Sequence, residues 1–179
     1  METAINSLHF NTSKLTNMNT FTRPINFRKL IGSIALCELI GIIAGLFTIN
    51  AIKEWYVYLN KPEFNPPNWI FGPVWTLLYL LMGIAFYNTL KSNIKNANYH
   101  RSISLFWVQL TLNFFWTIAF FGMRSPMLAF AIIIALIASV CVWILYLQKV
   151  HKTSAYLQIP YLLWCCFACI LNYYIIRLN

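Results

Sequence analysis

Charged side chains are scarce in this sequence of 179 residues: Asp, Glu, Lys and Arg together make up 9% of it, and only four of them are acidic. A soluble domain carries about 25% charged residues, so this composition excludes an ordinary water-exposed fold. The sequence has no paired-carboxylate motif, no glycine-rich phosphate loop and no Ser/His/Asp arrangement, so no catalytic constellation is visible. The three histidines, His9, His100 and His151, are spaced for no metal site. We therefore expect no metal and no resident cofactor.

Basic residues outnumber acidic ones, but their distribution does not fit nucleic-acid binding. The formal net charge is +9, yet the thirteen Lys and Arg residues are scattered through short connections between apolar runs. A nucleic-acid site needs them gathered on one face, so we expect no such partner. The five cysteines all lie inside apolar runs, and no histidine or acid lies near the cluster of Cys165, Cys166 and Cys169. We interpret them as packing residues and predict no disulfide framework.

The apolar runs have the length of membrane spans. Hydrophobic residues make up 60% of the chain, and its mean hydropathy is +0.63. A helix crosses a hydrocarbon core with about 20 apolar residues. Five runs meet that length, at about 30–52, 69–90, 103–122, 126–147 and 155–176. We predict an all-α integral membrane protein, a five-transmembrane-helix bundle over residues 29–179, preceded by a disordered polar tail over residues 1–28.

The stretch from Trp55 to Ala85 joins a loop with three prolines to the second apolar run. Proline has no backbone N–H to donate, so this helix can begin at Pro66 and Pro67 but cannot run back through them. Asn65, directly before the pair, is the predicted N-cap. Four rings suited to the headgroup level flank the span, namely Trp55, Tyr56, Tyr58 and Trp69. This pattern predicts a loop docked on a membrane helix.

Polar, small and aromatic side chains recur at helical spacing along three spans. They are Gly72, Trp75, Tyr79 and Gly83 in the second span, Gln109, Asn113 and Trp116 in the third, and Tyr161, Trp164, Ala168 and Leu171 in the fifth. The two amides will not face lipid, so they either join helices or line a cavity. The nearly featureless fourth span is expected to pack, and Pro160 to kink the fifth near its start. An aromatic cavity closed by a mobile loop would suit a large, flat, apolar ligand.

The first span contains one charged residue, Glu38. A carboxylate at mid-membrane costs about 2.5–3.5 kcal/mol on insertion scales, so it must face protein or be protonated. Glu38 is either a partner for a ligand or proton, or a neutral acid hydrogen-bonded within the bundle, and the sequence favours the second. Gly41 and Gly45 lie four residues apart and predict a close helix approach on one face.

The basic residues also predict the orientation. Nine fall in the tail and in the second and fourth connections, and four fall on the opposite side. The N-terminus is therefore expected in the cytoplasm. The polar tail lacks a convincing mitochondrial transit pattern, which favours a bacterial cell membrane.

Three blocks of sequence resemble the translocator protein family, also called TspO/MBR, tryptophan-rich sensory proteins or peripheral-type benzodiazepine receptors. They are WY-x2-LNKP-x3-PPNW-x-FGPVW-x2-LY-x2-MG from Trp55, QLTLNFFWTIAFFG over 109–122, and IPYLLW-x6-LNYY from Ile159. The blocks follow the family's order and cover roughly 55–177. The resemblance implies a five-helix membrane protein, commonly dimeric, that binds porphyrins, sterols or drugs among its helices under the first loop.

The resemblance also implies roles for individual residues. Trp75 and Trp164 correspond to the tryptophans implicated in light-dependent porphyrin breakdown by some bacterial members, which makes them the catalytic candidates. Leu171, Tyr173 and Arg177 fit the family's cholesterol-recognition pattern, which is weak evidence by itself. The expected ligand-binding residues are Phe71, Trp75, Tyr79, Asn113, Trp116, Tyr161, Trp164, Ala168 and Leu171.

The sequence thus predicts a membrane receptor or sensor that binds porphyrin-like tetrapyrroles, with sterols as another ligand class, and that regulates tetrapyrrole or stress metabolism. A homodimer in the lipid bilayer is the expected assembly. Two alternatives stay open: a translocator that moves such ligands across the bilayer, and an enzyme that oxidises porphyrin in the light.

Overall fold

The computed structural model describes residues 24–93 and 95–179, so the predicted disordered tail lies largely outside the described residues. Its last residues are described, and there the boundary was wrong. Helix α2 (Phe27–Glu54) begins directly after Asn26, whose side-chain oxygen accepts a hydrogen bond from the Lys29 amide at 3.1 Å. Asn26 thereby acts as the N-cap. Phe27 and Arg28 therefore form the first turn of a helix rather than the end of a tail.

The described chain folds into five helical spans, each long and apolar enough to cross a membrane. The first two are α2 and α3 (Asn68–Lys91). The third is α4 (Ala97–Thr117), continued by the π-helical turn η3 (Ile118–Gly122), and the fourth is α5 (Pro126–Val150). The fifth consists of α6 (Lys152–Leu157) and α7 (Ile159–Leu178). The predicted fold class, an all-α membrane bundle with five spans, is confirmed.

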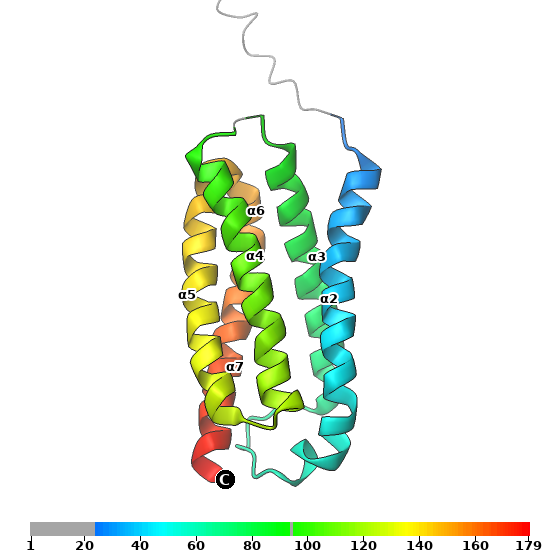
Figure 1. Ribbon diagram of the computed structural model, residues 1–179, viewed down its shortest axis with the longest axis vertical. Helices are drawn as coiled ribbons and strands as arrows, with labels where there is room; N and C mark the ends of the chain where they lie inside the picture. Colours follow the sequence, from blue (N-terminus) through cyan, green and yellow to red (C-terminus); the bar gives the residue numbers. More distant parts are fainter. Residues whose placement is uncertain (1–23, 94) are drawn as a thin grey trace, which may run out of the picture.

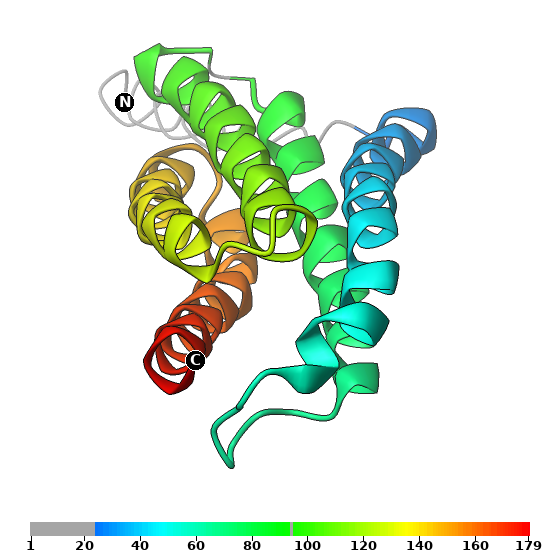
Figure 2. The ribbon, with the colours of Figure 1, turned by 60° about the horizontal axis from the view of Figure 1, so that its bottom comes forward.

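Consecutive spans alternate in direction, which sorts the connections between the two ends of the bundle (Figure 1). One end, called the loop end here, carries residues 55–67, the turn after η3 and the C-terminal end of α7. The start of α2, the α3–α4 connection and α6 lie at the opposite end. Figure 2 shows the connection 55–67 reaching from α2 across to the end of α7 before it returns to α3.

Two glycines on neighbouring faces let α2 and α3 approach closely. A Cβ atom on Gly83 would lie 2.6 Å from the Cα of Ile34, and one on Gly41 would overlap the ring of Tyr79. The backbone-to-backbone proximity at Gly83 is possible only without a side chain. Gly45 has no atom within 4 Å of its Cβ position. Of the predicted pair, Gly41 makes room for the Tyr79 ring of α3 and Gly45 faces an open space, whereas the backbone contact between the two helices is made at Gly83.

The fourth span is a packing helix, as predicted. Helix α5 lies against α4 and α7, and Trp143 in its C-terminal half is 1% exposed and packs on Phe106. The predicted break in the fifth span is confirmed at Gln158, two residues before Pro160, where α6 ends and α7 begins. The Gln158 side chain donates to the carbonyl oxygen of Leu81 at 3.2 Å, so the break is tied to α3.

The start of α3 differs from the prediction in one respect. The helix begins after the proline pair, but Pro67 occupies the cap position and Asn65 is not the N-cap. The two intervening prolines hold the Asn65 side chain away from the first free N–H groups of the helix. Asn65 instead accepts a hydrogen bond from the Tyr56 hydroxyl at 2.9 Å and donates to the Pro66 carbonyl at 3.0 Å. Its role is to hold the loop.

Candidate functional site

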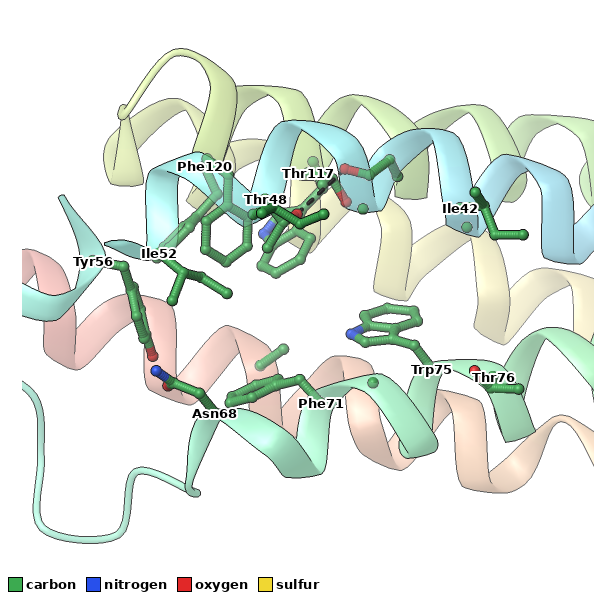
Figure 3. A pocket seen from close by; sticks show the side chains of 18 of the residues that line it. Ile42, Thr48, Ile52, Tyr56, Asn68, Phe71, Trp75, Thr76, Thr117 and Phe120 are labelled. Atoms are coloured by element: carbon green, nitrogen blue, oxygen red, sulfur yellow. Dashed lines mark hydrogen bonds between the residues drawn. The ribbon is translucent and has the colours of Figure 1, made fainter. Parts of the chain in front are cut away.

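A cavity of about 360 Å³ lies at the loop end of the bundle, between α2, α3, the α4–η3 junction and α7. The short 3₁₀ helix η2 (Tyr56–Tyr58) covers it from the loop. Helix α5 contributes no lining residue, in agreement with its packing role. Figure 3 shows Tyr56 and Asn68 at the loop end of this space and Ile42 and Thr76 toward its inner end.

The α2 wall contains three small residues, which leave room for the cavity. Gly41, Ala44 and Gly45 line it, and nothing fills the space in front of Gly45. The Thr48 hydroxyl donates back to the Ala44 carbonyl at 3.3 Å. That bond satisfies the hydroxyl within its own helix. The stretch from Gly41 to Thr48 thus offers shape rather than polarity to a ligand, and the one charged residue of the α2 wall is Glu38.

The opposite walls are aromatic. The Trp75 ring lies 5.6 Å from that of Tyr79 and 6.4 Å from that of Trp116, with interplanar angles near 30°. Trp116 in turn stacks on Phe120 at 5.6 Å. Figure 3 shows the Trp75 indole projecting from α3 into the open space, with Phe71 one turn closer to the loop. Rings presented in this way offer their faces and edges to a flat apolar molecule.

A buried polar network stands behind the aromatic wall and fixes it. The Tyr79 hydroxyl donates to Asn113 Oδ1 at 2.5 Å, and Asn113 Nδ2 donates to the Tyr161 hydroxyl at 3.1 Å. Asn113 is 1% exposed and Tyr161 is fully buried. Gln109, one turn before Asn113, donates to the Met82 sulfur at 3.2 Å. Both amides of the third span therefore join helices, and neither lines the cavity.

The structure brings six of the nine predicted ligand-binding residues to the cavity wall: Phe71, Trp75, Tyr79, Trp116, Ala168 and Leu171. Asn113 and Tyr161 lie one layer behind, in the polar network. Trp164 also lies outside the lining, with its ring 5.9 Å from Phe71 and 5.4 Å from Phe167. Trp164 can thus affect a ligand through the Phe71 ring.

The residues of the sterol pattern do not gather at one place. Leu171 is buried and lines the cavity, whereas Tyr173 is 47% exposed and packs on Phe130. Arg177 is exposed at the loop end. Two residues apart on a helix, Leu171 and Tyr173 point to different sides. Only Leu171 of this pattern faces the internal space.

The loop is docked over the cavity by specific contacts. Tyr56 is 4% exposed and lines the cavity, and burial raises the pKa of its hydroxyl to about 12, so the phenol stays neutral. The Lys61 ammonium donates to the carbonyls of Tyr56 at 2.7 Å and of Leu59 at 2.8 Å, and it lies 4.9 Å from the centre of the Tyr56 ring. Burial lowers the pKa of Lys61. Through these contacts of Lys61, the Leu-Asn-Lys-Pro segment holds the loop over the cavity.

The tip of the loop is held by α7. Phe64 packs edge-on against Phe167 and Tyr174 at 6.4 and 5.3 Å. The Asn60 amide donates to Asn179 Oδ1 at 3.0 Å, and Asn179 Nδ2 donates to the Asn60 carbonyl at 3.0 Å. The cover of the cavity is therefore fastened at its far end to the helix that forms one cavity wall.

Several lining residues were not among the predicted binding residues, notably Glu38, Thr48, Phe120 and Asn172. The spacing of Glu38, Gly41 and Gly45 along one face of α2 was the available signal for the first wall. Asn172 is 1% exposed and donates to the Pro126 carbonyl at 2.9 Å. Across residues 24–93 and 95–179, no three His, Cys, Asp or Glu side chains lie close enough together to hold a metal ion.

Comparison with known proteins agrees with this architecture. The sequence model of the TspO/MBR family matches residues 33–178. The chain is 41% identical to the tryptophan-rich protein TspO of Archaeoglobus fulgidus over 155 residues, which is 87% of this chain and 99% of that protein. It is 34% identical to the tryptophan-rich sensory protein of Cereibacter sphaeroides, over 70% of this chain and 77% of that one.

Animal proteins are also similar. The human translocator protein is 33% identical over 127 residues, which is 70% of this chain and 75% of the human protein. The family match covers all five spans and the loop between the first two, and so includes the cavity and its cover. The chain is a multi-pass integral membrane protein of the TspO/MBR family.

Proposed function

We propose that this protein is a membrane receptor or sensor that binds porphyrin-like tetrapyrroles, with sterols as a second ligand class. Its occupancy would regulate tetrapyrrole or stress metabolism. The observation that carries the proposal is the aromatic wall of Trp75, Trp116 and Phe120, which faces a largely apolar α2 wall with small residues along it. A flat apolar ring fits between two such walls, whereas a compact polar substrate would leave the aromatic faces unused.

The size of the cavity is compatible with a ligand that is partly enclosed. Ligand pockets have volumes of about 300–1,000 Å³, and this one has about 360 Å³. Lining residues that are also exposed, such as Ile42, Ile49 and Thr76, lie on α2 and α3. The open side therefore lies between these two helices, and a macrocycle larger than the enclosed space extends through it toward the lipid.

A titration of the purified protein with a porphyrin, followed by tryptophan quenching, tests the proposal. Replacing Trp75 by alanine removes an aromatic contact of roughly 0.5–1.5 kcal/mol beyond area burial, so binding should weaken several-fold. The control is Trp143→Phe, in the packing helix away from the cavity, which should leave affinity unchanged. Equal losses in both variants would show that the cavity is not the binding site.

The second candidate function is light-driven porphyrin oxidation. The observation that favours it is that Trp75 packs within 6.4 Å of three other oxidisable rings, those of Tyr79, Trp116 and Tyr161. Trp75→Phe and Trp164→Phe keep an aromatic ring and should bind nearly normally, yet they should lose conversion, because phenylalanine is much harder to oxidise than indole. Normal binding without any conversion by the unaltered protein in light and oxygen would retire this candidate.

A third candidate, translocation, is favoured by the names of similar proteins, among them the translocator proteins of human and sheep. Vectorial uptake of porphyrin into proteoliposomes separates it from sensing. The resemblance to dimeric family members also supports a homodimer, which size measurement in detergent or nanodiscs would test.

The proposed orientation places the N-terminus in the cytoplasm of a bacterial cell. The end opposite the loop carries Arg28, Lys29, Lys91, Lys95, Arg101, Lys149 and Lys152, and the loop end carries Lys53, Lys61, Arg124 and Arg177. This asymmetry supports the orientation through the positive-inside rule. In a background without native cysteines, Glu63→Cys should react with impermeant thiol reagents in intact cells, and Asn93→Cys should not. The reverse pattern would overturn the orientation.

A further inference from the structure

Glu38 is the only Asp, Glu, Lys or Arg among the residues that line the cavity. It lies eleven residues from the start of α2 and sixteen from its end, which at 1.5 Å per residue is about 16 and 24 Å from the two helix ends. All other charged residues of the described chain lie within five residues of a helix end or in connections. Glu38 is thus a single, partly exposed acid well inside the first span, at the edge of a largely apolar cavity.

No protein group satisfies this carboxyl. Within the described residues, Glu38 makes neither a hydrogen bond nor an ion pair, and the one salt bridge joins Arg124 to Glu54 at the loop end. The alternative favoured from the sequence, a neutral acid hydrogen-bonded within the bundle, lacks the partner that it requires. A carboxylate at this depth is unfavourable by about 2.5–3.5 kcal/mol on insertion scales, so an unpaired carboxylate destabilises the fold.

The residues around Glu38 restrict the kinds of ligand that could pair with its carboxylate. A hard divalent cation needs about six or more oxygen ligands. The other residues at the inner end of the cavity, Gly41, Ile42, Thr76 and Tyr79, supply at most two hydroxyls, and that of Tyr79 already donates to Asn113. A ligand with an apolar body and one positively charged nitrogen fits this site. Its body fills the aromatic space, and its charge pairs with the carboxylate.

We propose that Glu38 is the counter-ion for a bound ligand. The inner end of the cavity selects flat apolar molecules that carry a protonated amine or another cationic nitrogen group over molecules of the same shape that are neutral or anionic there. This inference rests on the proposed ligand-binding function and adds a charge preference to it. A tetrapyrrole with carboxylate arms then binds with those arms at the loop end, where Tyr56, Asn68 and Asn172 line the cavity and no acid does.

The test uses three porphyrins that share one macrocycle and differ in one arm: an aminoalkyl arm, the same arm acetylated on nitrogen, and a carboxyalkyl arm. Affinities for the purified full chain are measured by tryptophan quenching at neutral pH. The unaltered protein should prefer the amine over its acetylated form by tenfold or more, which is about 1.4 kcal/mol. Glu38→Gln keeps the shape of the side chain and should remove this preference, while affinity for the acetylated porphyrin stays within about twofold.

Two further variants separate charge from structure. Glu38→Asp keeps a carboxylate on a shorter arm and should retain part of the preference. Glu54→Gln removes an acid from the same helix outside the cavity, where it pairs with Arg124 at the exposed loop end, and should leave the preference intact. Glu38→Gln should bind the carboxyalkyl porphyrin at least as tightly as the unaltered protein, because a repulsive charge is removed.

Each other outcome overturns the proposal. Equal affinity of the unaltered protein for the amine and acetylated porphyrins would show that Glu38 is not a counter-ion, and the porphyrin-binding function would survive. An equal loss of affinity for all three porphyrins in Glu38→Gln would show that Glu38 has a structural role instead. Failure of the unaltered protein to bind any of the three would refute the proposed function and this inference together.

Discussion

Lys61 fastens the cover of the cavity, and replacing it by methionine tests whether that cover controls ligand release. Its ammonium donates to the carbonyl oxygens of Tyr56 at 2.7 Å and Leu59 at 2.8 Å, and more weakly to that of Val57 at 3.3 Å. All three carbonyls belong to the turn that places Tyr56 over the cavity. Lys61→Met keeps the length of the side chain and its apolar stem but removes every one of these bonds.

The magnitude follows from the bonds that are lost. A hydrogen bond to a charged group contributes about 1.5–3 kcal/mol net, and the partly exposed position of Lys61 calls for the lower end of that range for the set as a whole. At about 1.4 kcal/mol per factor of ten, the open form of the loop should become roughly tenfold more populated. If ligands leave only when the loop opens, the dissociation rate rises by the same factor, while the closed site itself is unchanged.

The assay is stopped-flow displacement of a bound porphyrin, with helix content checked by circular dichroism. Lys53→Met is the matched control, because Lys53 is an exposed lysine in the last turn of α2 that makes no contact with the loop carbonyls. We expect faster release from Lys61→Met alone. An unchanged dissociation rate, with the protein folded, would show that ligands leave by another route, such as the open side between α2 and α3.

Three further predictions concern the scaffold. Replacing both Pro66 and Pro67 by alanine should accelerate ligand dissociation at unchanged helix content, because α3 can then extend backward and the loop gains conformational freedom; identical off-rates would contradict this. Gly83→Ala should lower stability by about 1–3 kcal/mol through overpacking against the α2 backbone, whereas Gly32→Ala, in open space, should not, as measured by thermal unfolding in detergent. Asn113→Leu should destabilise the protein by about 1–3 kcal/mol, because the change leaves two buried tyrosine hydroxyls without partners, and a stability equal to that of the unaltered protein would refute the network.

The five spans were predictable because one physical quantity, the length of each apolar run, decides them. The ends of the spans were less predictable. The third span was predicted to start at residue 103, but α4 begins at Ala97, because Asn96 caps it by accepting from the Tyr99 amide and the polar turn up to Arg101 is helical beyond the apolar run. Hydropathy reports where a helix is apolar, whereas capping and backbone hydrogen bonds decide where it ends.

The cavity was predictable only in part, for a geometric reason. Helical periodicity gives the direction in which a side chain points. Of the four residues that it grouped on the second span, Gly72, Trp75 and Tyr79 share the cavity wall, whereas Gly83 packs against the α2 backbone. It gives no depth. Asn113 and Trp116 were assigned to one face of the third span, yet Trp116 reaches the cavity while Asn113 stops behind Tyr79, because a ring from another helix stands in between.

The same limit explains why Glu38 could not be interpreted from the sequence. Whether a buried acid is a satisfied structural group or a free one depends on what the neighbouring helices bring to within about 3 Å of it, and no property of α2 alone determines that. Here α3 brings Tyr79, whose hydroxyl is already donated to Asn113. The bonds that join Tyr79, Asn113 and Tyr161 commit the Tyr79 hydroxyl to the network, so it does not donate to the carboxyl of Glu38. The polar network that stabilises the aromatic wall is thus also the reason that the acid in front of it remains available to a ligand.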